Sequence, residues 1–317
     1  MRQDREEALW AVSAPLSRAA VPIMNGFARR KILRHGAVQR DIRLNGMNIH
    51  YYYAGQHDPE SDMLSPRQPL FLVHGLADSA LTWSFIFPQL ARWYDVYAID
   101  LPGYGLSGLP DGKTYTHLDE TKELLTSFIQ EVIGRPTLVV GNSMGAWLAV
   151  KAAWDIPELM RGLILLNPGG APLKGRVSWQ PFLDSISCRD LRSVRRVMRH
   201  MLDHSPRPLV YLSQFSFRDI FLRQVVREFV AAVQEDEFLR PEDLRQIPVP
   251  TALIWGITDQ FLPEGSYNFF RDNLTGSPVH VLKHCGHLPQ REQPRFVERF
   301  IHSYDEALSQ SKSTVVS

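Results

Sequence analysis

The sequence predicts an α/β protein with a doubly wound, mostly parallel sheet and a helical insertion between two of its strands. Short runs of apolar, often β-branched residues alternate with stretches of helical periodicity, which is the rhythm of βαβ units. Several of these runs are apolar without interruption, as expected of strands buried on both faces of a parallel sheet. The alternation stops between residues 171 and 247, where apolar residues recur only at helical spacing.

Residues 1–40 are expected to form an N-terminal helical arm, divided into two pieces by Pro15 and Pro22. A basic cluster over residues 29–35 ends the arm. We interpret the arm as a helix that packs on the body of the protein and has a solvated basic end. The alternative is an amphipathic arm that contacts a membrane surface or covers a substrate entrance. Its candidate apolar positions are Leu9, Trp10, Val12, Leu16, Ile23, Met24, Phe27 and Ile32.

Residues 41–170 and 248–317 are expected to form the core. Asn45-Gly46 lies between two strand-like runs and predicts a tight β-hairpin over residues 41–53, before an exposed loop over 54–69. Further strands are expected at residues 70–73, 96–99, 137–140, 162–166, 251–255 and 278–282. Helices are expected at residues 82–92, 117–133, 146–154, 264–273 and 295–308, and the chain after Ser309 is expected to fray.

The composition excludes several classes of function. A formal net charge of +1 gives no reason to expect a nucleic-acid partner. Cys188 and Cys285 match no metal-ligand spacing, so we expect buried free thiols in a reduced compartment, the cytoplasm. No apolar run is long enough to span a bilayer, and the N-terminus is too acidic for a signal peptide. Neither a metal nor an organic cofactor is indicated.

The stretch from Thr137 to Trp147 carries the strongest functional signal. An apolar run ends in Gly-Asn-Ser-Met-Gly, and a helix-forming run follows directly. A G-x-S-x-G pattern between a strand and a helix is typical of a nucleophile elbow, in which a sharp turn strains the backbone of the central serine. Gly141 and Gly145 would let the strand and the helix approach each other closely. We therefore interpret Ser143 as a nucleophile rather than as an ordinary helix N-cap.

A serine hydroxyl needs a base to attack a carbonyl at neutral pH, and the base is usually a histidine. His287 lies in a loop just after an expected strand, so it reaches the edge of the sheet at which Ser143 is expected. His284 is its nearest rival, but it follows the strand with little loop to reach the serine.

A carboxylate is expected to hold the imidazole of that base in the correct tautomer. Asp259 lies in the loop after the strand at 251–255, which opens toward the same edge of the sheet. The chain order Ser143, Asp259, His287 is the order in which serine, aspartate and histidine follow one another in triads built on a nucleophile elbow. Asp155 and Asp184 are the alternatives for this role.

A tetrahedral oxyanion needs two preorganised backbone donors. The N–H of Met144, which follows the nucleophile, is one candidate. The second is expected from the loop after the strand at 70–73, where the N–H of Leu76 is the candidate donor and Gly75 lets the backbone turn toward the site. His74 is expected to hold this loop in place rather than to act as the base.

These motifs resemble the α/β-hydrolase superfamily over roughly residues 40–305. The resemblance implies the α/β-hydrolase fold, with residues 171–247 as a mobile helical cap inserted after the sixth strand. Haloalkane dehalogenases and epoxide hydrolases of this superfamily carry aspartate at the elbow, and Ser143 argues against both. The signatures are His74-Gly75, the run from Asp100 to Gly105, the elbow, the run from Trp255 to Asp259, and Gly286-His287.

Two branches of the superfamily compete. The elbow and His-Cys-Gly-His are similar to the meta-cleavage-product hydrolases, which use the same triad to cut carbon–carbon bonds. Those enzymes usually carry tryptophan after the catalytic histidine and a second glycine after the elbow, where this chain has Leu288 and Ala146. The strand end at 166–168, the N-terminal arm and the apolar cap look more like bacterial carboxylesterases and monoacylglycerol-type lipases, which act on acyl esters under an apolar lid.

We therefore expect a serine carboxylesterase, lipase-like, that cleaves a small acyl ester through an acyl-enzyme on Ser143. The carbon–carbon hydrolase is the alternative, and an intact triad argues against a noncatalytic receptor or scaffold. Peripheral contact with a membrane or lipid through the arm or the cap is a further expectation. The cap residues that we expect to line the acyl pocket, unless they are simply cap core, are Trp179, Phe182, Met198, Leu202, Tyr211 and Phe215.

Overall fold

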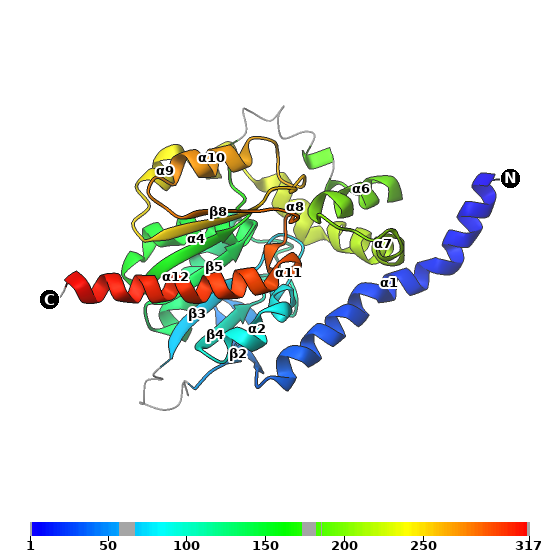
Figure 1. Cartoon of the computed structure of the whole chain (residues 1–317). Helices are drawn as coiled ribbons and strands as arrows, with labels where there is room; N and C mark the ends of the chain where they lie inside the picture. Colours follow the sequence, from blue (N-terminus) through cyan, green and yellow to red (C-terminus); the bar gives the residue numbers. More distant parts are fainter. Residues whose placement is uncertain (1, 57–66, 173–181, 185, 316–317) are drawn as a thin grey trace.

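A computed structural model describes residues 2–56, 67–172, 182–184 and 186–315, and confirms the expected α/β-hydrolase fold (Figure 1). In the described part of the chain, eight strands form one sheet in the order β1-β2-β4-β3-β5-β6-β7-β8. The strands are β1 (Val38–Leu44), β2 (Met47–Ala54), β3 (Gln68–Val73), β4 (Tyr94–Ile99), β5 (Thr137–Asn142), β6 (Met160–Leu166), β7 (Thr251–Gly256) and β8 (Val279–Leu282).

The sheet is parallel from β4 onward, and only the β1–β2 and β2–β4 pairs are antiparallel. Asn45 and Gly46 join β1 to β2 with φ angles of 47° and 76°, which is the tight hairpin turn expected there. Because β3 to β8 run in parallel, the loops that follow them meet at one edge of the sheet. This edge carries the loops of Leu76, Ser143, Met144, Asp259 and His287.

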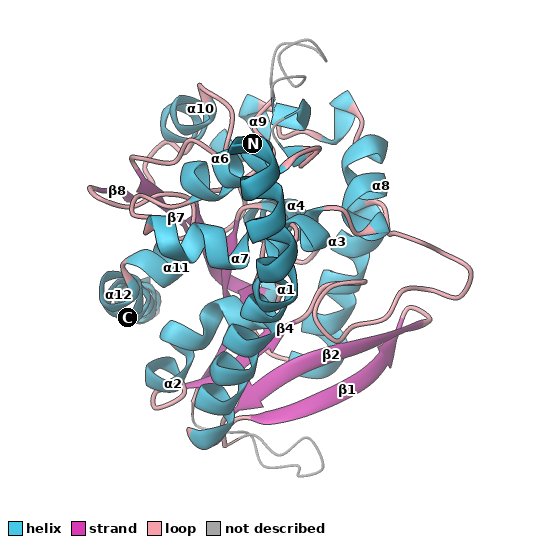
Figure 2. Ribbon diagram, turned by 90° about the vertical axis from the view of Figure 1, so that its right-hand side faces the viewer, coloured by secondary structure: helices cyan, strands magenta, loops and turns pink. Residues whose placement is uncertain are grey.

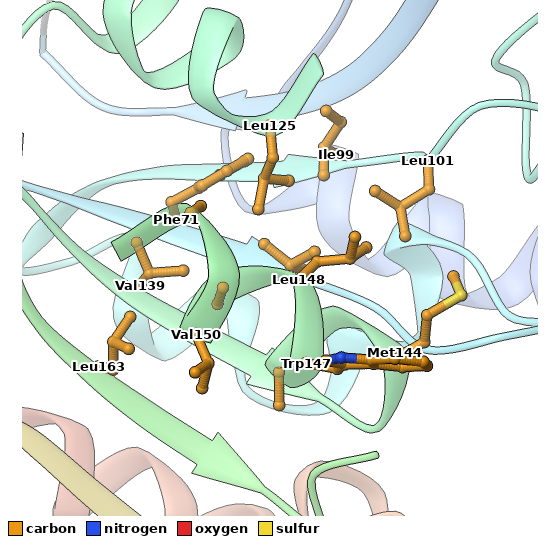
Figure 3. Packing of buried hydrophobic residues seen from close by; sticks show 14 of the residues in the cluster. Phe71, Ile99, Leu101, Leu125, Val139, Met144, Trp147, Leu148, Val150 and Leu163 are labelled. Carbon is orange, nitrogen blue, oxygen red and sulfur yellow. The ribbon is translucent and has the colours of Figure 1, made fainter. Parts of the chain in front are cut away.

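Helices cover both faces of the sheet, and alternate residues of each inner strand serve one face or the other. Phe71 and Val73 of β3 belong to the apolar cluster under α3 and α4, part of which is shown in Figure 3, whereas Leu70 and Leu72 belong to the opposite cluster. The first face carries α3 (Leu118–Ser127), η2 (Phe128–Ile133), α4 (Met144–Asp155) and α10 (Ser266–Asn273). The second carries η1 (Ala80–Phe85), α2 (Phe87–Leu90) and α12 (Pro294–Val315).

Two of the expected helices differ from the prediction. The helix expected at residues 82–92 is replaced by the 3-10 turn η1 and the short α2, with Pro88 near the start of α2. The last helix, α12, does not end near residue 308 as expected but continues through the polar tail to Val315. The short elements η3 (Pro157–Leu159) and α11 (Pro289–Glu292) complete the core.

The described part of the segment between β6 and β7 consists of helices joined by loops, with no strand. It contains α6 (Leu191–Met201), α7 (Arg207–Phe221), α8 (Gln224–Ala232), η4 (Glu235–Glu237) and α9 (Pro241–Arg245). Val194, Val197 and Phe221 form a small apolar cluster of their own with Cys188 and with Phe261 of the core. Cys188 and Cys285 are buried free thiols, as expected, and burial raises the pKa of the Cys188 thiol to about 11.

The N-terminal arm is one continuous helix, α1 (Arg2–Arg34), so the expected break into two pieces is wrong. Pro22 has no N–H to donate to the carbonyl of Arg18 four residues earlier. The hydroxyl of Ser216 in α7 lies 2.6 Å from that carbonyl oxygen and from that of Ser17, and it donates in place of the missing backbone group. α7 therefore stabilises the helix where proline weakens it, and Figure 2 shows α1 lying across α7.

The expected apolar stripe of α1 is only partly buried. Ile32 is fully buried against the sheet, but Leu16, Ile23 and Phe27 are 71%, 56% and 66% exposed. The side chains of Leu9, Trp10 and Val12 lie outside the described residues. Helices in the described part of the chain include none that is both long and apolar enough to cross a bilayer.

Candidate active site

Ser143 occupies the sharp turn between β5 and α4. Its φ of 55° and ψ of −119° lie in a region that side-chain-bearing residues rarely adopt, as expected for a nucleophile elbow. A Cβ at Gly141 would lie 2.6 Å from the Ala146 nitrogen, and one at Gly145 would lie 2.4 Å from the Val73 carbonyl oxygen. Both glycines are therefore required by the close approach of α4 to β5 and β3.

His287 and Asp259 form a hydrogen-bonded pair beside this turn. Asp259 follows β7, His287 follows β8, and the imidazole Nδ1 lies 2.8 Å from the Asp259 Oδ2. The two side chains are 2% and 0% exposed. Because Nδ1 is engaged by the carboxylate, Nε2 is the nitrogen left to exchange protons with a reacting group. His287 and Ser143 line the same cavity, so the structure brings the three expected residues to one place.

Asn167 orients Asp259 and had no role in the sequence prediction. The Asn167 Nδ2 donates to the Asp259 Oδ2 at 2.7 Å, and its Oδ1 accepts from the Gly256 N–H at 3.0 Å. The other Asp259 oxygen accepts N–H groups from Phe261 and Leu262 at 2.8 and 3.2 Å. A carboxylate that accepts from this many donors is held in one orientation. The signal that could have found Asn167 is its place directly after β6, at the same edge of the sheet.

Asn142 joins the elbow to the histidine loop. Its Nδ2 lies 3.0 Å from both the Leu166 and the His287 carbonyl oxygens, and its Oδ1 accepts from Gln290 at 3.2 Å. Asn142 is the first variable position of G-x-S-x-G. Its side chain is held by hydrogen bonds to β6, to the histidine loop and to α11. Sequence reasoning passed over it because the motif leaves the position open.

The rival residues make other contacts. The His284 side chain lines the same cavity as Ser143, but it is 89% exposed and lies 3.9 Å from Asp203, whereas Asp259 is bonded to His287. Asp155, at the end of α4, forms an ion pair with Lys122 at 2.6 Å. Asp184 is exposed and lies 3.5 Å from Arg189.

The loop that carries the second oxyanion candidate is held by His74. The Leu101 N–H donates to His74 Nε2 at 3.0 Å, so the proton of the neutral ring lies on Nδ1, which donates to the Gly75 carbonyl at 2.7 Å. With both ring nitrogens engaged, His74 positions the loop and is not free to act as a base. Leu76 and Met144 line a cavity together with Ser143. Met144 begins α4, so its N–H has no intrahelical acceptor.

Gly75 serves a different purpose from the one expected. A Cβ there would lie 2.9 Å from the Cβ of Ser143, so the residue is small because the loop presses against the nucleophile. Its φ is not in the left-handed range, and no special turn is required.

Asp100 braces the neighbouring loop after β4. Its carboxylate accepts N–H groups from Ala80 at 2.7 Å and Leu106 at 3.0 Å, and it lies 3.2 Å from Nδ1 of the buried His50. Burial would raise the pKa of this carboxyl, but the His50 ring and the two N–H donors hold it below its ordinary value. A Cβ at Gly105 would lie only 2.1 Å from the Asp100 carboxyl carbon. The Asp-Leu-Pro-Gly-Tyr-Gly signature is therefore a structural support of the site.

Two cavities meet at Ser143. Cavity A, of about 810 Å³, is lined largely by apolar side chains that include Trp147, Phe182, Phe229, Val230 and Phe238, and it also has Glu235 and Asp236 in its lining. Cavity B, of about 620 Å³, is lined by His287, by residues between β6 and β7 that include Met198 and Leu202, and by Val21, Met24 and Asn25 of α1. Phe261 lines both cavities, and its ring centre lies 4.7 Å from that of His287.

Of the residues expected to line the acyl pocket, Phe182 lines cavity A, Met198 and Leu202 line only cavity B, and Tyr211 and Phe215 line neither. Tyr211 lies 5.1 Å below the guanidinium of Arg195, and Phe215 lies 5.6 Å from that of Arg18 at the α1–α7 contact. Neither lines cavity A or B, because the face of α7 that carries them is turned away from the serine. Trp179 lies outside the described residues. Within the ranges that the structure describes, no three His, Cys, Asp or Glu side chains are grouped to hold a metal ion.

Comparisons with known proteins agree with this geometry. Residues 70–300 match a family described as the Alpha/beta hydrolase family. The chain is 27% identical over 276 residues to the uncharacterized hydrolase YugF of Bacillus subtilis, with 84% of this chain and 97% of that protein covered. It is 27% identical over 269 residues to 2-hydroxy-6-oxo-6-(2'-aminophenyl)hexa-2,4-dienoic acid hydrolase of Metapseudomonas resinovorans, with 81% and 87% covered. Among solved structures it is similar to a bacterial membrane phospholipase A, with a TM-score of 0.76, 21% identity, and 98% and 99% of the two chains covered.

We predict that Asn167→Ala slows covalent labelling of Ser143 by a fluorophosphonate probe by about 10- to 100-fold, because a small displacement of the Asp259–His287 pair is costly to the reaction. Asn273→Ala is the matched control, since the Asn273 amide is also buried but bonds within its own helix. Labelling would be followed by intact mass against time, with Tm measured for both variants. Equal labelling rates for Asn167→Ala and the wild type would contradict the role of Asn167.

Proposed function

The chain belongs to the α/β hydrolase family and is a hydrolase, and from this premise we propose that it cleaves carboxylic esters by a serine mechanism. The observation that carries the proposal is the position of Ser143, between a buried His–Asp pair and the apolar cavity A. Such a cavity suits an acyl chain, since it removes apolar surface from water without requiring charged partners.

In the proposed mechanism His287 removes the proton from the Ser143 hydroxyl as the oxygen attacks the ester carbonyl. The N–H groups of Met144 and Leu76 stabilise the oxyanion, and Asp259 stabilises the imidazolium. His287 then protonates the leaving alcohol, and an acyl-enzyme remains on Ser143. Water activated by the same histidine releases the acid and restores the serine.

A carbon–carbon hydrolase is the second candidate, and the similarity to the dienoic acid hydrolase of Metapseudomonas resinovorans favours it. The ester proposal is preferred because Leu288 follows the histidine and Ala146 follows the elbow, where meta-cleavage-product hydrolases usually carry tryptophan and glycine. Both candidates use the same triad, so only the substrate separates them.

We predict that the protein hydrolyses p-nitrophenyl esters and that Ser143→Ala lowers kcat by at least about 10⁴-fold. The same preparation would be assayed with a vinylogous diketone of the meta-cleavage type. Hydrolysis of the diketone with no detectable turnover of any ester would replace the ester proposal with the carbon–carbon one. Turnover of neither, with no labelling by a fluorophosphonate probe, would remove both.

We also propose that the acyl group lies in cavity A and the alcohol in cavity B. The leaving oxygen must lie within hydrogen-bond reach of the His287 Nε2 to be protonated. His287 lines cavity B and not cavity A, so an alcohol in cavity B departs beside its proton donor. Glu235 and Asp236 would disfavour an acyl chain that ends in a carboxylate, because like charges repel.

This assignment is tested by filling one cavity at a time. Val230→Trp in cavity A is predicted to lower kcat/KM for long acyl chains by about 10- to 100-fold while sparing short ones, because the larger side chain occupies the space of the chain. Leu209→Trp in cavity B is the matched control and should act on the size of the alcohol instead. The reverse pattern, with Val230→Trp altering alcohol preference alone, would overturn the assignment.

We further propose that one face of α1 contacts an anionic lipid surface. Leu16, Ile23 and Phe27 are exposed and share a helix face with the exposed Arg30 and Arg34, since their positions repeat at three-, four- and seven-residue intervals. Apolar side chains beside basic ones suit the boundary of an acidic bilayer. The same helix lines cavity B through Val21 and Met24.

The wild-type protein is predicted to co-sediment with vesicles of phosphatidylcholine and phosphatidylglycerol more than with phosphatidylcholine alone. Phe27→Glu should reduce the bound fraction several-fold, because it places a charge on the apolar face. Val281→Glu is the control, since Val281 is 41% exposed on the edge strand β8. Equal binding of the wild type to both kinds of vesicle, or equal loss with both variants, would remove the lipid proposal.

A further inference from the structure

The histidine loop is held between the core and the end of cap helix α6. The His287 N–H donates to the Met201 carbonyl at 2.7 Å, and the Gln260 N–H, beside Asp259, donates to the His200 carbonyl at 3.1 Å. A Cβ at Gly286 would lie 2.6 Å from the same Met201 oxygen. The last turn of α6 is therefore in contact with the backbone of both loops that carry the His–Asp pair.

Glu292 hydrogen-bonds to both sides of this contact. It ends the short helix α11, and its two carboxylate oxygens accept from two different segments. Oε1 accepts the Gly286 N–H at 2.9 Å, and Oε2 accepts the Asp203 N–H at 2.7 Å. Gly286 directly precedes His287, and Asp203 belongs to the chain that leaves α6. The Glu292 carboxylate and the Met201 carbonyl thus each join the histidine loop to the end of α6, through different backbone N–H groups.

We propose that Glu292 is a positioning residue, which fixes the backbone of His287 relative to Ser143 by holding Gly286 and Asp203 on its two oxygens. The inference rests on the proposed function, in which His287 is the base. Gly286 has no side chain to restrain it, and Asp203 lies in a loop, so these two hydrogen bonds add to the restraint that Met201 and Asn142 place on the His287 backbone. The Glu292 carboxylate lines cavity B, but its hydrogen bonds go to backbone N–H groups and not to the side chain of Ser143, Asp259 or His287.

The chemistry explains why a carboxylate is required. Only an ionised carboxylate offers two acceptor oxygens, whereas an amide offers one oxygen and an NH₂ group that would face an N–H donor. Without the Glu292 carboxylate, the N–H groups of Gly286 and Asp203 would donate to water instead. The His287 ring would then sample positions away from the serine. Displacements of about 1 Å in such geometry cost up to roughly 100-fold in rate.

The experiment compares Glu292→Ala, Glu292→Gln and the matched control Glu298→Ala, which removes a carboxylate from the next helix, α12. With a p-nitrophenyl ester, Glu292→Ala is expected to lose about tenfold in kcat with KM changed less than twofold, because positioning rather than binding is lost. Glu292→Gln should recover part of the loss, and Glu298→Ala should behave as the wild type. Thermal unfolding of each variant shows whether it is folded.

Amide hydrogen exchange provides a readout that does not depend on turnover. Exchange at Gly286 and Asp203 is expected to accelerate at least tenfold in Glu292→Ala and to stay unchanged in Glu298→Ala. Unchanged kcat in a folded Glu292→Ala, a main effect on KM, or unchanged exchange at both amides would overturn the inference. If the wild type hydrolyses no ester and is not labelled at Ser143, the proposed function fails, and the exchange result alone then decides whether Glu292 holds the loop.

Discussion

The backbone of Ser143 is the constraint on which the rest of the site depends. A side-chain-bearing residue at φ 55° and ψ −119° is strained, and it persists only because its surroundings leave no other conformation. Three glycines provide the necessary space, at positions 75, 141 and 145, where a Cβ would collide with the turn or with β3. The result places Ser143 in a sharp turn at the end of β5, directly before the first residue of α4.

A nucleophile raised in this way is useful only if loops from several strands are aligned with it. Each of these loops would be mobile alone, and buried polar side chains join them in pairs. Asn142 joins the elbow to the histidine loop, Asn167 joins β6 to Asp259, and His74 joins the loop after β3 to the end of β4. In a buried setting each such hydrogen bond is expensive to leave unmade, so the network has few alternative arrangements.

The sequence was informative where a single residue type is dictated by local geometry or by unbroken burial. Neighbouring residues in the sequence explain the glycines around Ser143, the Asn45-Gly46 turn and the apolar strands. The fold could be predicted from these features. Asn167, Asn142 and Glu292 could not be found in this way, because each bonds to at least one partner that lies more than eighty residues away in the chain. The continuous α1 was missed for a related reason, since the Ser216 hydroxyl that replaces the missing N–H of Pro22 belongs to a helix almost two hundred residues later.

The wall that α1 contributes to cavity B has a consequence for how relatives are compared with this protein. The region shared with the family spans residues 70–300, so Val21, Met24 and Asn25 lie outside it although they line the cavity next to His287. A homologue can therefore preserve the whole common domain and still present a different surface to the substrate. The other residues that line cavity B all lie within the shared region, so a comparison of its binding surface with that of a relative has to include both stretches of the polypeptide.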